Sequence, residues 1–378
     1  MIITYLLCLG GLVLLLAGAQ WLVDSASGIA ARYEIPPIFI GVVIVALATS
    51  APEVAVSVDA AIAGQPELAL GNVVGSNIVN ILLILGISAL LKPIAIRRSM
   101  VRIDVPLLIL ISLMVYLFSL NRFLDLWEGI VLLIIFFGFV GFQIWQVRKE
   151  TSSEHPDAES PPSIDRPLPI QIIIFTVGLG ALILGAHWMV SSSVDIARYW
   201  GMSELVIGLT IISVGTSMPE VATSVVAAMQ EQQDLSVGNV VGSNILNLLL
   251  VLGLSSVVSG GGFQISEAAI ALDLPFMVAV SVACLPIFFT GHRITRWEGG
   301  VFVFYYVAYL LYLFLDATGH ELLPRFNLVM LLFVVPITIL TIIVLVGRAV
   351  YLKRLEKKAD DLRKGYPDSD LNVNNSRE

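Results

Sequence analysis

The sequence predicts an all-α polytopic membrane protein: two inverted five-helix repeats that form a ten-helix core, plus an appended eleventh transmembrane helix. Hydrophobic residues make up 57% of the 378 positions and charged residues only 13%, and the mean hydropathy is +0.91. Apolar runs recur that are long enough to cross about 30 Å of hydrocarbon. A long segment of the first half also recurs in the second half. Together these features exclude a soluble globular protein.

The apolar runs fall into two sets of five. The first set covers residues 2–23, 36–63, 68–91, 103–120 and 126–147, and the second covers 169–190, 203–229, 235–258, 269–290 and 297–315. An eleventh run at 327–347 has no partner. The first run lacks a basic segment before it and has a counterpart at 170–190, so it is predicted to be a span and not a cleaved signal. The two cysteines, Cys8 and Cys284, lie in apolar runs and are predicted to be packing residues.

These runs define the predicted organisation of the chain. The segments are a first repeat at 1–148, a cytoplasmic linker at 149–168, a second repeat at 169–316, an extra helix at 326–350 and a cytoplasmic tail at 351–378. The linker is rich in Ser, Pro and acidic residues and has no core of its own.

The strongest internal similarity joins residues 41–90 to residues 208–257 at a constant offset of 167, with 28 identities in 50 positions. The copies agree best at Thr-Ser-x-Pro-Glu and at Gly-Asn-Val-Val-Gly-Ser-Asn-Ile-x-Asn. Matching polar motifs within apolar helices of two repeats are typical of the binding site of a transporter.

The distribution of basic residues predicts the orientation of the spans. An odd number of spans per repeat places the two halves in opposite orientations. With the N-terminus outside, 18 Lys and Arg residues lie inside and 3 outside, out of 21. The positive-inside rule therefore predicts a multi-pass protein of the plasma (inner) membrane, with the N-terminus outside and the C-terminus in the cytoplasm.

Two prolines predict a break in the helices that carry the first motif. Pro52 and Pro219 have no amide hydrogen, and their rings clash with the carbonyl groups of Ala48 and Gly215, four residues earlier. Freed carbonyls are tolerated in a bilayer only where protein, water or an ion satisfies them. We therefore expect each helix to kink or unwind beside its polar motif.

Each of these helices also carries one carboxylate, Glu53 or Glu220. Hydroxyl residues flank each carboxylate at four-residue spacing: Thr49 and Ser57 in the first copy, Thr216 and Ser224 in the second. A carboxylate near the bilayer centre costs about 2.5–3.5 kcal/mol, so two in matching positions indicate a functional role. Carboxylate, hydroxyl and carbonyl oxygens suit Ca²⁺ or Na⁺, and no Cys or His in these motifs favours a softer metal.

The next helix of each repeat carries the second motif. Its polar residues recur at four-residue spacing: Asn72, Ser76 and Asn80 in the first copy, Asn239, Ser243 and Asn247 in the second. The paired glycines of this motif indicate close helix packing. Asn77 and Asn244 are expected to hydrogen-bond backbone at a tight helix crossing. Inverted repeats would bring both Glu-bearing and both Asn-bearing helices together at a pseudo-twofold axis.

The paired motifs resemble the alpha repeats of the cation/calcium exchanger superfamily, which contains sodium/calcium exchangers, over about residues 1–316. The resemblance implies that Glu53 and Glu220 are shared between Ca²⁺ and Na⁺ sites. It implies further ligands at Thr49, Ser50, Thr216, Ser217, Ser76, Asn80, Ser243 and Asn247, and at the backbone carbonyls of Ala46 and Ser213. The first and sixth spans are expected to slide across this core.

The chain departs from the family pattern at two places, and at a third it differs from the proton-coupled branch alone. Ala48 replaces a usual glycine. Asn80 and Asn247 are both amides, where some relatives carry one Asp, so a dependence on K⁺ stays open. Gly75 and Gly242 stand where the proton-coupled branch carries an acidic residue, which favours Na⁺ over protons.

The function predicted from these observations is a secondary antiporter that exchanges Na⁺ for Ca²⁺ by alternating access. A proton-coupled or K⁺-dependent exchanger on the same fold is the alternative. An intramembrane hydrolase using Ser50 or Ser76 is disfavoured, because no His in these helices could act as a base. The predicted partners are Ca²⁺, Na⁺ and membrane lipid, with no cofactor and no nucleic acid, and no feature of the sequence indicates an oligomeric state.

Overall fold

The computed structural model describes residues 1–151, 166–202, 204–207, 210–211, 213–289, 293–337, 339–340, 343 and 347. The elements of the first half are α1 (Ile2–Arg32), α2 (Pro37–Phe39), η1 (Ile40–Val45), α3 (Ala46–Thr49), α4 (Ala51–Ile62), α5 (Pro66–Ile78), η2 (Val79–Leu85), α6 (Gly86–Leu91), β1 (Ile94–Ala95), η3 (Met100–Asp104), α7 (Val105–Ser119), β2 (Phe123–Asp125) and α8 (Leu126–Thr151). Those of the second half are α9 (Leu168–Tyr199), α10 (Glu204–Ile207), α11 (Ser213–Gly215), α12 (Met218–Met229), α13 (Gln233–Leu246), η5 (Asn247–Val251), α14 (Leu252–Val258), β3 (Gly262–Gln264), η6 (Ala269–Asp273), α15 (Leu274–Phe289), β4 (Arg293–Ile294), α16 (Arg296–Ala317), α17 (Leu323–Val329) and η7 (Met330–Val334). The η elements are short π-helical turns that continue the α-helices beside them.

Most of the predicted spans coincide with long apolar helices. Seven continuous helices among the described residues are long and apolar enough to cross a membrane, and the bent pair Pro37–Thr49 and Ala51–Ile62 adds an eighth. The other three predicted spans contain the shorter apolar helices Met218–Met229, Ala269–Leu285 and Leu323–Ile337. The predicted linker and tail fall largely at 152–165 and 348–378, outside the described residues.

Helices α1 and α9 continue beyond the apolar runs of the first and sixth predicted spans, which end at residues 23 and 190. Helix α1 continues to Arg32 and α9 to Tyr199. Their last turns contain polar but small residues, including Ser25, Ser27 and Ser192, which are buried against neighbouring helices. Hydropathy falls there, but burial of these small side chains supports further helical turns.

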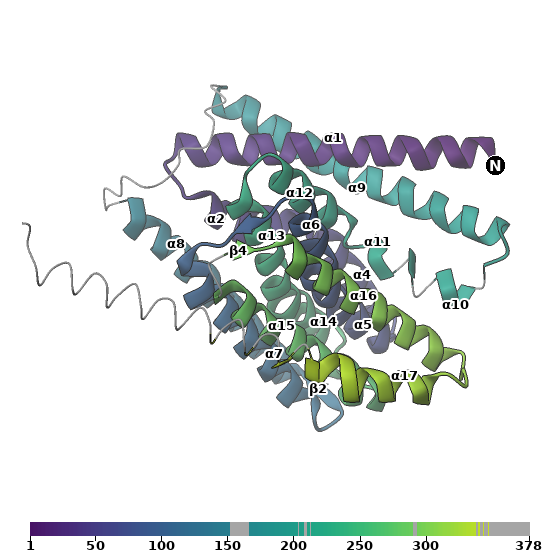
Figure 1. The fold of residues 1–378 in the computed structure, drawn as a ribbon. Coiled ribbons are helices and arrows are strands. Elements are labelled where there is room, and N and C mark those ends of the chain that lie inside the picture. The colour runs from purple at the N-terminus through teal and green to yellow at the C-terminus, as the bar shows by residue number, and fades with distance from the viewer. Residues whose placement is uncertain are drawn as a thin grey trace, which may run out of the picture.

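Helices α1 and α9 lie side by side across one face of the molecule (Figure 1). Glycines allow their backbones to approach closely: a β-carbon at Gly18 would lie 2.6 Å from Leu182 N, and one at Gly185 would lie 2.5 Å from Leu15 N. Small residues at a crossing favour such close packing of membrane helices. The side chains of this pair form a hydrophobic cluster of their own with parts of η1, α12 and α13.

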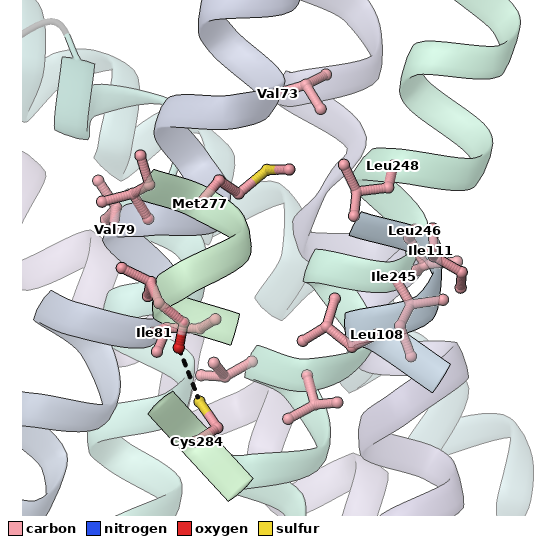
Figure 2. Close-up of a cluster of buried hydrophobic side chains, with 14 of the residues drawn as sticks. Val73, Val79, Ile81, Leu108, Ile111, Ile245, Leu246, Leu248, Met277 and Cys284 are labelled. Carbon is pink, nitrogen blue, oxygen red and sulfur yellow. Dashed lines mark hydrogen bonds between the residues drawn. The ribbon is translucent and has the colours of Figure 1, made fainter. Parts of the chain in front are cut away.

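The main hydrophobic core joins the remaining core helices of both halves. Figure 2 shows part of it, where Val73, Ile81, Leu108 and Ile245 belong to the same buried cluster as Met277 and Cys284 of α15. Cys284 is 1% exposed in this core, and its thiol donates to Val280 O at 3.7 Å. Cys8 and Cys284 are both free thiols, Cys8 half-buried and Cys284 buried.

Two short antiparallel strand pairs join loops of the two halves. Strand β1 pairs with β4, so that Ile94 lies opposite Ile294. Strand β2 pairs with β3, so that Leu124 lies opposite Phe263. Each pair therefore fixes one loop of the first half to one loop of the second half.

Candidate functional site

Both helices that carry the first motif are broken where the prolines predict it. The second span bends by 46° between α3 and α4. Ser50 at this break has φ −80° and ψ 6°, and Ser217 at the corresponding break has φ −83° and ψ 6°. Glu53 and Glu220 therefore lie in the first turns of α4 and α12, where the partial positive charge of a helix N-terminus stabilises a carboxylate.

The two carboxylates are linked across the halves by reciprocal hydrogen bonds. Ser217 Oγ donates to Glu53 Oε1 at 3.2 Å, and Ser50 Oγ donates to Glu220 Oε1 at 3.1 Å. Both glutamates are 1% exposed. The structure thus brings together the Ser-Pro-Glu segments of both repeats, as the sequence predicts.

A second reciprocal layer joins each broken helix to the Asn-bearing helix of the other half. Thr49 Oγ1 donates to Asn239 Oδ1 at 3.2 Å, and Thr216 Oγ1 donates to Asn72 Oδ1 at 3.1 Å. Each asparagine also donates to a serine of its own half at 2.9 Å: Asn72 to Ser57 and Asn239 to Ser224. The stripe of hydroxyls on each broken helix therefore holds the asparagines in place.

Sequence reasoning left Asn72 and Asn239 out of the predicted ligands. Their spacing of four residues from Ser76 and Ser243 is the signal that could have included them. Their contacts explain why both copies keep an amide at this position, since it both accepts from a threonine and donates to a serine.

The two Asn-bearing helices cross through a third reciprocal set. Asn77 Nδ2 donates to Asn244 O at 3.4 Å, and Asn244 Nδ2 donates to Asn77 O at 3.3 Å. This confirms the expected backbone hydrogen bonds at a tight helix crossing. The side-chain oxygens of the same pair also accept hydrogen bonds. Asn244 Oδ1 accepts from Asn80 Nδ2 at 2.9 Å, and Asn77 Oδ1 accepts from Asn247 Nδ2 at 3.3 Å.

Six buried oxygens beside these contacts have no hydrogen-bond partner among the described residues. They form three matched pairs: Glu53 Oε2 and Glu220 Oε2, Ser76 Oγ and Ser243 Oγ, and Asn80 Oδ1 and Asn247 Oδ1. A buried oxygen without a partner is unfavourable unless a ligand or water satisfies it. All six belong to residues predicted as ligands, so the structure leaves these atoms available for a cation.

The two predicted backbone ligands, the carbonyl groups of Ala46 and Ser213, precede the breaks in their helices. Ala46 O accepts from Ser50 N at 2.9 Å and from Thr49 Oγ1 at 3.4 Å, so it lies next to the break. Ser213 is the first residue of α11, one turn before the corresponding break. Within the described residues no three His, Cys, Asp or Glu side chains form a metal-binding group, so any cation here depends on the two glutamates and neutral oxygens.

The two halves of the site differ in exposure. Thr49 and Asn239 are 0% exposed, whereas Thr216 and Asn72 are half-buried. Asp59, beyond Glu53 on α4, is exposed. The polar centre is therefore more accessible beside Asn72 than beside Asn239.

Comparison with known proteins identifies the family. The sequence matches the family described as Sodium/calcium exchanger protein over residues 3–145 and 170–315. It is 40% identical over 326 residues to CaxA of Alkalimonas amylolytica, covering 83% of this chain and 99% of the relative. It is 31% identical to the sodium/calcium exchanger MaX1 of Methanosarcina acetivorans, covering 82% and 99%. A solved structure of the sodium-calcium exchanger NCX_Mj superposes with a TM-score of 0.69 at 27% identity, covering 81% of this chain and 97% of that one. The chain belongs to the sodium/calcium exchanger family of membrane transporters.

Proposed function

We propose that this protein is a secondary antiporter that moves Na⁺ and Ca²⁺ in opposite directions across the plasma membrane through one central site. The observation that carries the proposal is the set of six buried oxygens without partners, which occur in matched pairs around Glu53 and Glu220. Carboxylate, hydroxyl and amide oxygens are the ligands that these hard cations prefer. A bound cation would satisfy all three kinds of oxygen at once.

The charge of the centre suits one divalent cation. Glu53 and Glu220 together balance one Ca²⁺, while neutral oxygens complete its coordination. The proposed ligands beside them are Thr49, Ser50, Thr216, Ser217, Ser76, Asn80, Ser243, Asn247 and the carbonyls of Ala46 and Ser213. If Na⁺ uses the same glutamates, binding of the two cations is mutually exclusive, and this exclusion produces exchange without leak.

The arrangement of the helices supports alternating access. Helices α1 and α9 pack mainly on each other, and only five residues of η1, α12 and α13 join their buried hydrophobic cluster, which favours their movement as a pair across the other helices. If several Na⁺ ions replace one Ca²⁺, each cycle moves net charge and its rate depends on the membrane potential.

The strand pairs support the inverted orientation of the repeats. Strands β1 and β2 lie at opposite ends of the fourth span, and β3 and β4 lie at opposite ends of the ninth. Because β1 pairs with β4 and β2 with β3, the loop after the third span of one half meets the loop after the fourth span of the other. Corresponding loops of the two halves would then lie on opposite faces, and the distribution of basic residues supports a cytoplasmic C-terminus.

The test is cation-dependent Ca²⁺ flux in proteoliposomes, with Na⁺, K⁺ and H⁺ gradients imposed one at a time. We expect a Na⁺ gradient alone to drive ⁴⁵Ca²⁺ uptake. A pH gradient that drives uptake without Na⁺ would establish proton coupling instead, and a requirement for K⁺ would establish the K⁺-dependent alternative.

The site itself is tested by Glu53→Gln and Glu220→Gln. Each change removes one carboxylate charge but keeps the side-chain shape, so we expect uptake to fall at least about tenfold, the scale of a lost interaction with a charged group. Asp59→Asn, an exposed change on the same helix as Glu53, is the matched control and should keep most of the uptake. Full transport in either Glu→Gln variant would refute the assignment.

A further inference from the structure

Residues 230–234, which form the turn after α12 and the first two residues of α13, bind two separate parts of the molecule. On one side they contact α1. Gln230 Nε2 donates to Asp24 Oδ1 at 3.1 Å, and the Ser27 hydroxyl donates to Gln232 Oε1. Gln232 Nε2 also donates to Gln230 Oε1 at 3.2 Å, so the two contacts with α1 form one connected unit.

On their other side the same residues contact the segment that follows α6. Lys92 Nζ lies 2.6 Å from Glu231 Oε1, and Arg97 Nε lies 2.8 Å from Asp234 Oδ2. The backbone N–H of Ala95 donates to Gln233 Oε1. This segment contains β1, which pairs with β4 of the other half. Residues 230–234, here called the latch, therefore tie α1 to a fixed part of the core.

The corresponding loop of the first half lacks these contacts. At an offset of 167, the latch sequence Gln-Glu-Gln-Gln-Asp corresponds to Ala63-Gly-Gln-Pro-Glu67. Among the described residues, no hydrogen bond joins a side chain of 63–67 to α9, the counterpart of α1. Side-chain hydrogen bonds thus join the latch to α1 at one end of the molecule. At the pseudo-symmetric end, the described residues form no equivalent bonds between 63–67 and α9.

The backbone of the two loops is nevertheless the same. Gly64 has φ 71°, and its counterpart Glu231 has φ 66°. A left-handed backbone disfavours a residue with a β-carbon. The presence of Glu at this position is consistent with a role for its side chain, which forms the ion pair with Lys92.

The latch spans the interface that would have to open. The inner end of α1 packs against α12 in one buried cluster that includes Ala26, Ala30 and Ala227. Access from the latch side requires this cluster to separate. The hydrogen bond that Asp24 accepts from Gln230 and the one that Ser27 donates to Gln232 must then break as well. Among the described residues, the loop at 63–67 forms no such bond to α9, so opening on the opposite side breaks none there.

We propose that the latch holds α1 against α12 and favours the conformation that is closed to the cytoplasm, so that the resting protein presents its site to the outside. The inference rests on the proposed function, because alternating access and the orientation place the latch at the cytoplasmic face. Loss of its two hydrogen bonds to α1 is expected to shift the equilibrium about tenfold toward the inward-open state.

The test uses a buried cysteine as a reporter of opening. Ala227→Cys is introduced into full-length protein carrying Cys8→Ala and Cys284→Ala, and a membrane-impermeant maleimide is added from the cytoplasmic face. Combined Gln230→Ala and Gln232→Ala changes should speed labelling about tenfold. Gln65→Ala, the counterpart of the change at Gln232, should leave the rate unchanged. An unchanged rate in the latch variant would overturn the proposal.

Two further measurements separate the latch from general unfolding. A reporter at Val240→Cys, in the main core and 0% exposed, should stay unlabelled in the latch variant, and its labelling would overturn the proposal. Ser27→Ala should speed labelling by itself, and combining it with Gln232→Ala should add less than the sum of the two, because both remove the same bond. Full additivity would contradict a direct role for that contact.

Labelling requires no ion flux, so it tests the latch independently of the proposed exchange of Na⁺ for Ca²⁺. A protein that exchanges Na⁺ for Ca²⁺ but shows no rise in labelling refutes the latch alone. A rise in labelling in a protein without Na⁺-driven Ca²⁺ flux refutes the proposed coupling and keeps the latch.

Discussion

Helices α5 and α13 carry nearly the same sequence but have different neighbours. A β-carbon at Gly242 on α13 would lie 2.3 Å from Val42 O, and one at Gly238 would lie 2.9 Å from Ile38 O. At the corresponding Gly71 and Gly75 on α5, a β-carbon would meet no atom of the described residues within 4 Å. Helix α13 therefore holds the first part of the broken second span against its glycines, while the same face of α5 borders open space.

That open space is a cavity of about 240 Å³. It is lined by Glu67, Gly71 and Gly75 of the third span, together with Asp273, Tyr306 and Tyr309 from the ninth and tenth spans. The polar centre is by contrast nearly identical in the two halves, because each Ser–Glu, Thr–Asn and Asn–Asn contact has its counterpart. Two equal half-sites thus lie between unequal surroundings, which a carrier open to one side at a time requires.

The largest expected difference between the halves is the effect of adding one methyl group. Gly242→Ala should lower the free energy of unfolding by about 3 kcal/mol, because the new β-carbon overlaps backbone atoms that cannot move without displacing η1. Gly75→Ala should be neutral or stabilise by up to about 1 kcal/mol, since alanine favours a helix over glycine. Thermal unfolding in detergent checks both variants. Equal losses would show that the two faces are packed alike.

A smaller difference is expected for the serines that bind Asn72 and Asn239. Ser224→Ala leaves the amide of a fully buried Asn239 without its partner and should cost about 1.5 kcal/mol. Ser57→Ala should cost about 0.5 kcal/mol, because water can reach the half-buried Asn72. Chemical denaturation of the two variants in one detergent compares them directly, and a larger loss for Ser57→Ala would reverse our interpretation of which half is open.

The smallest effect concerns the turn that carries Glu231 in one half and Gly64 in the other. The hydrogen bond from Lys92 and the charge of that side chain lower the pKa of Glu231 below its ordinary value of 4.5. A lowered pKa in the folded state means that the ion pair stabilises the protein above pH 4.5 and that this contribution is lost as the pH falls through the lower value. Melting temperatures measured from pH 6 to pH 3 should therefore drop slightly less in Glu231→Gln than in the unchanged protein. Identical pH profiles would show that the pair contributes nothing to stability, as many exposed pairs do.

The sequence predicted much of the site because its residues act through local geometry. Pro52 and Pro219 break their helices wherever those helices lie, and a four-residue spacing places Thr49, Glu53 and Ser57 on one face in any helix. The duplicated motifs also predicted that both glutamates would lie together. The apolar runs did not predict how far α1 and α9 continue, because hydropathy measures the preference of a residue for lipid, whereas small polar residues such as Ser25 and Ser27 are buried against protein.

The division between sequence and tertiary structure follows from symmetry. The sequence by itself determined the apolar spans, the broken helices and the two matching half-sites, since each depends on residues within one repeat. Only the tertiary structure decided which half is packed closely, because Gly75 and Gly242 have the same local sequence and differ only in the helix that lies against them. The same is true of the latch, where Glu231 lies 139 positions from Lys92 and Gln232 lies 205 positions from Ser27, so that only the packing of the helices brings these residues together.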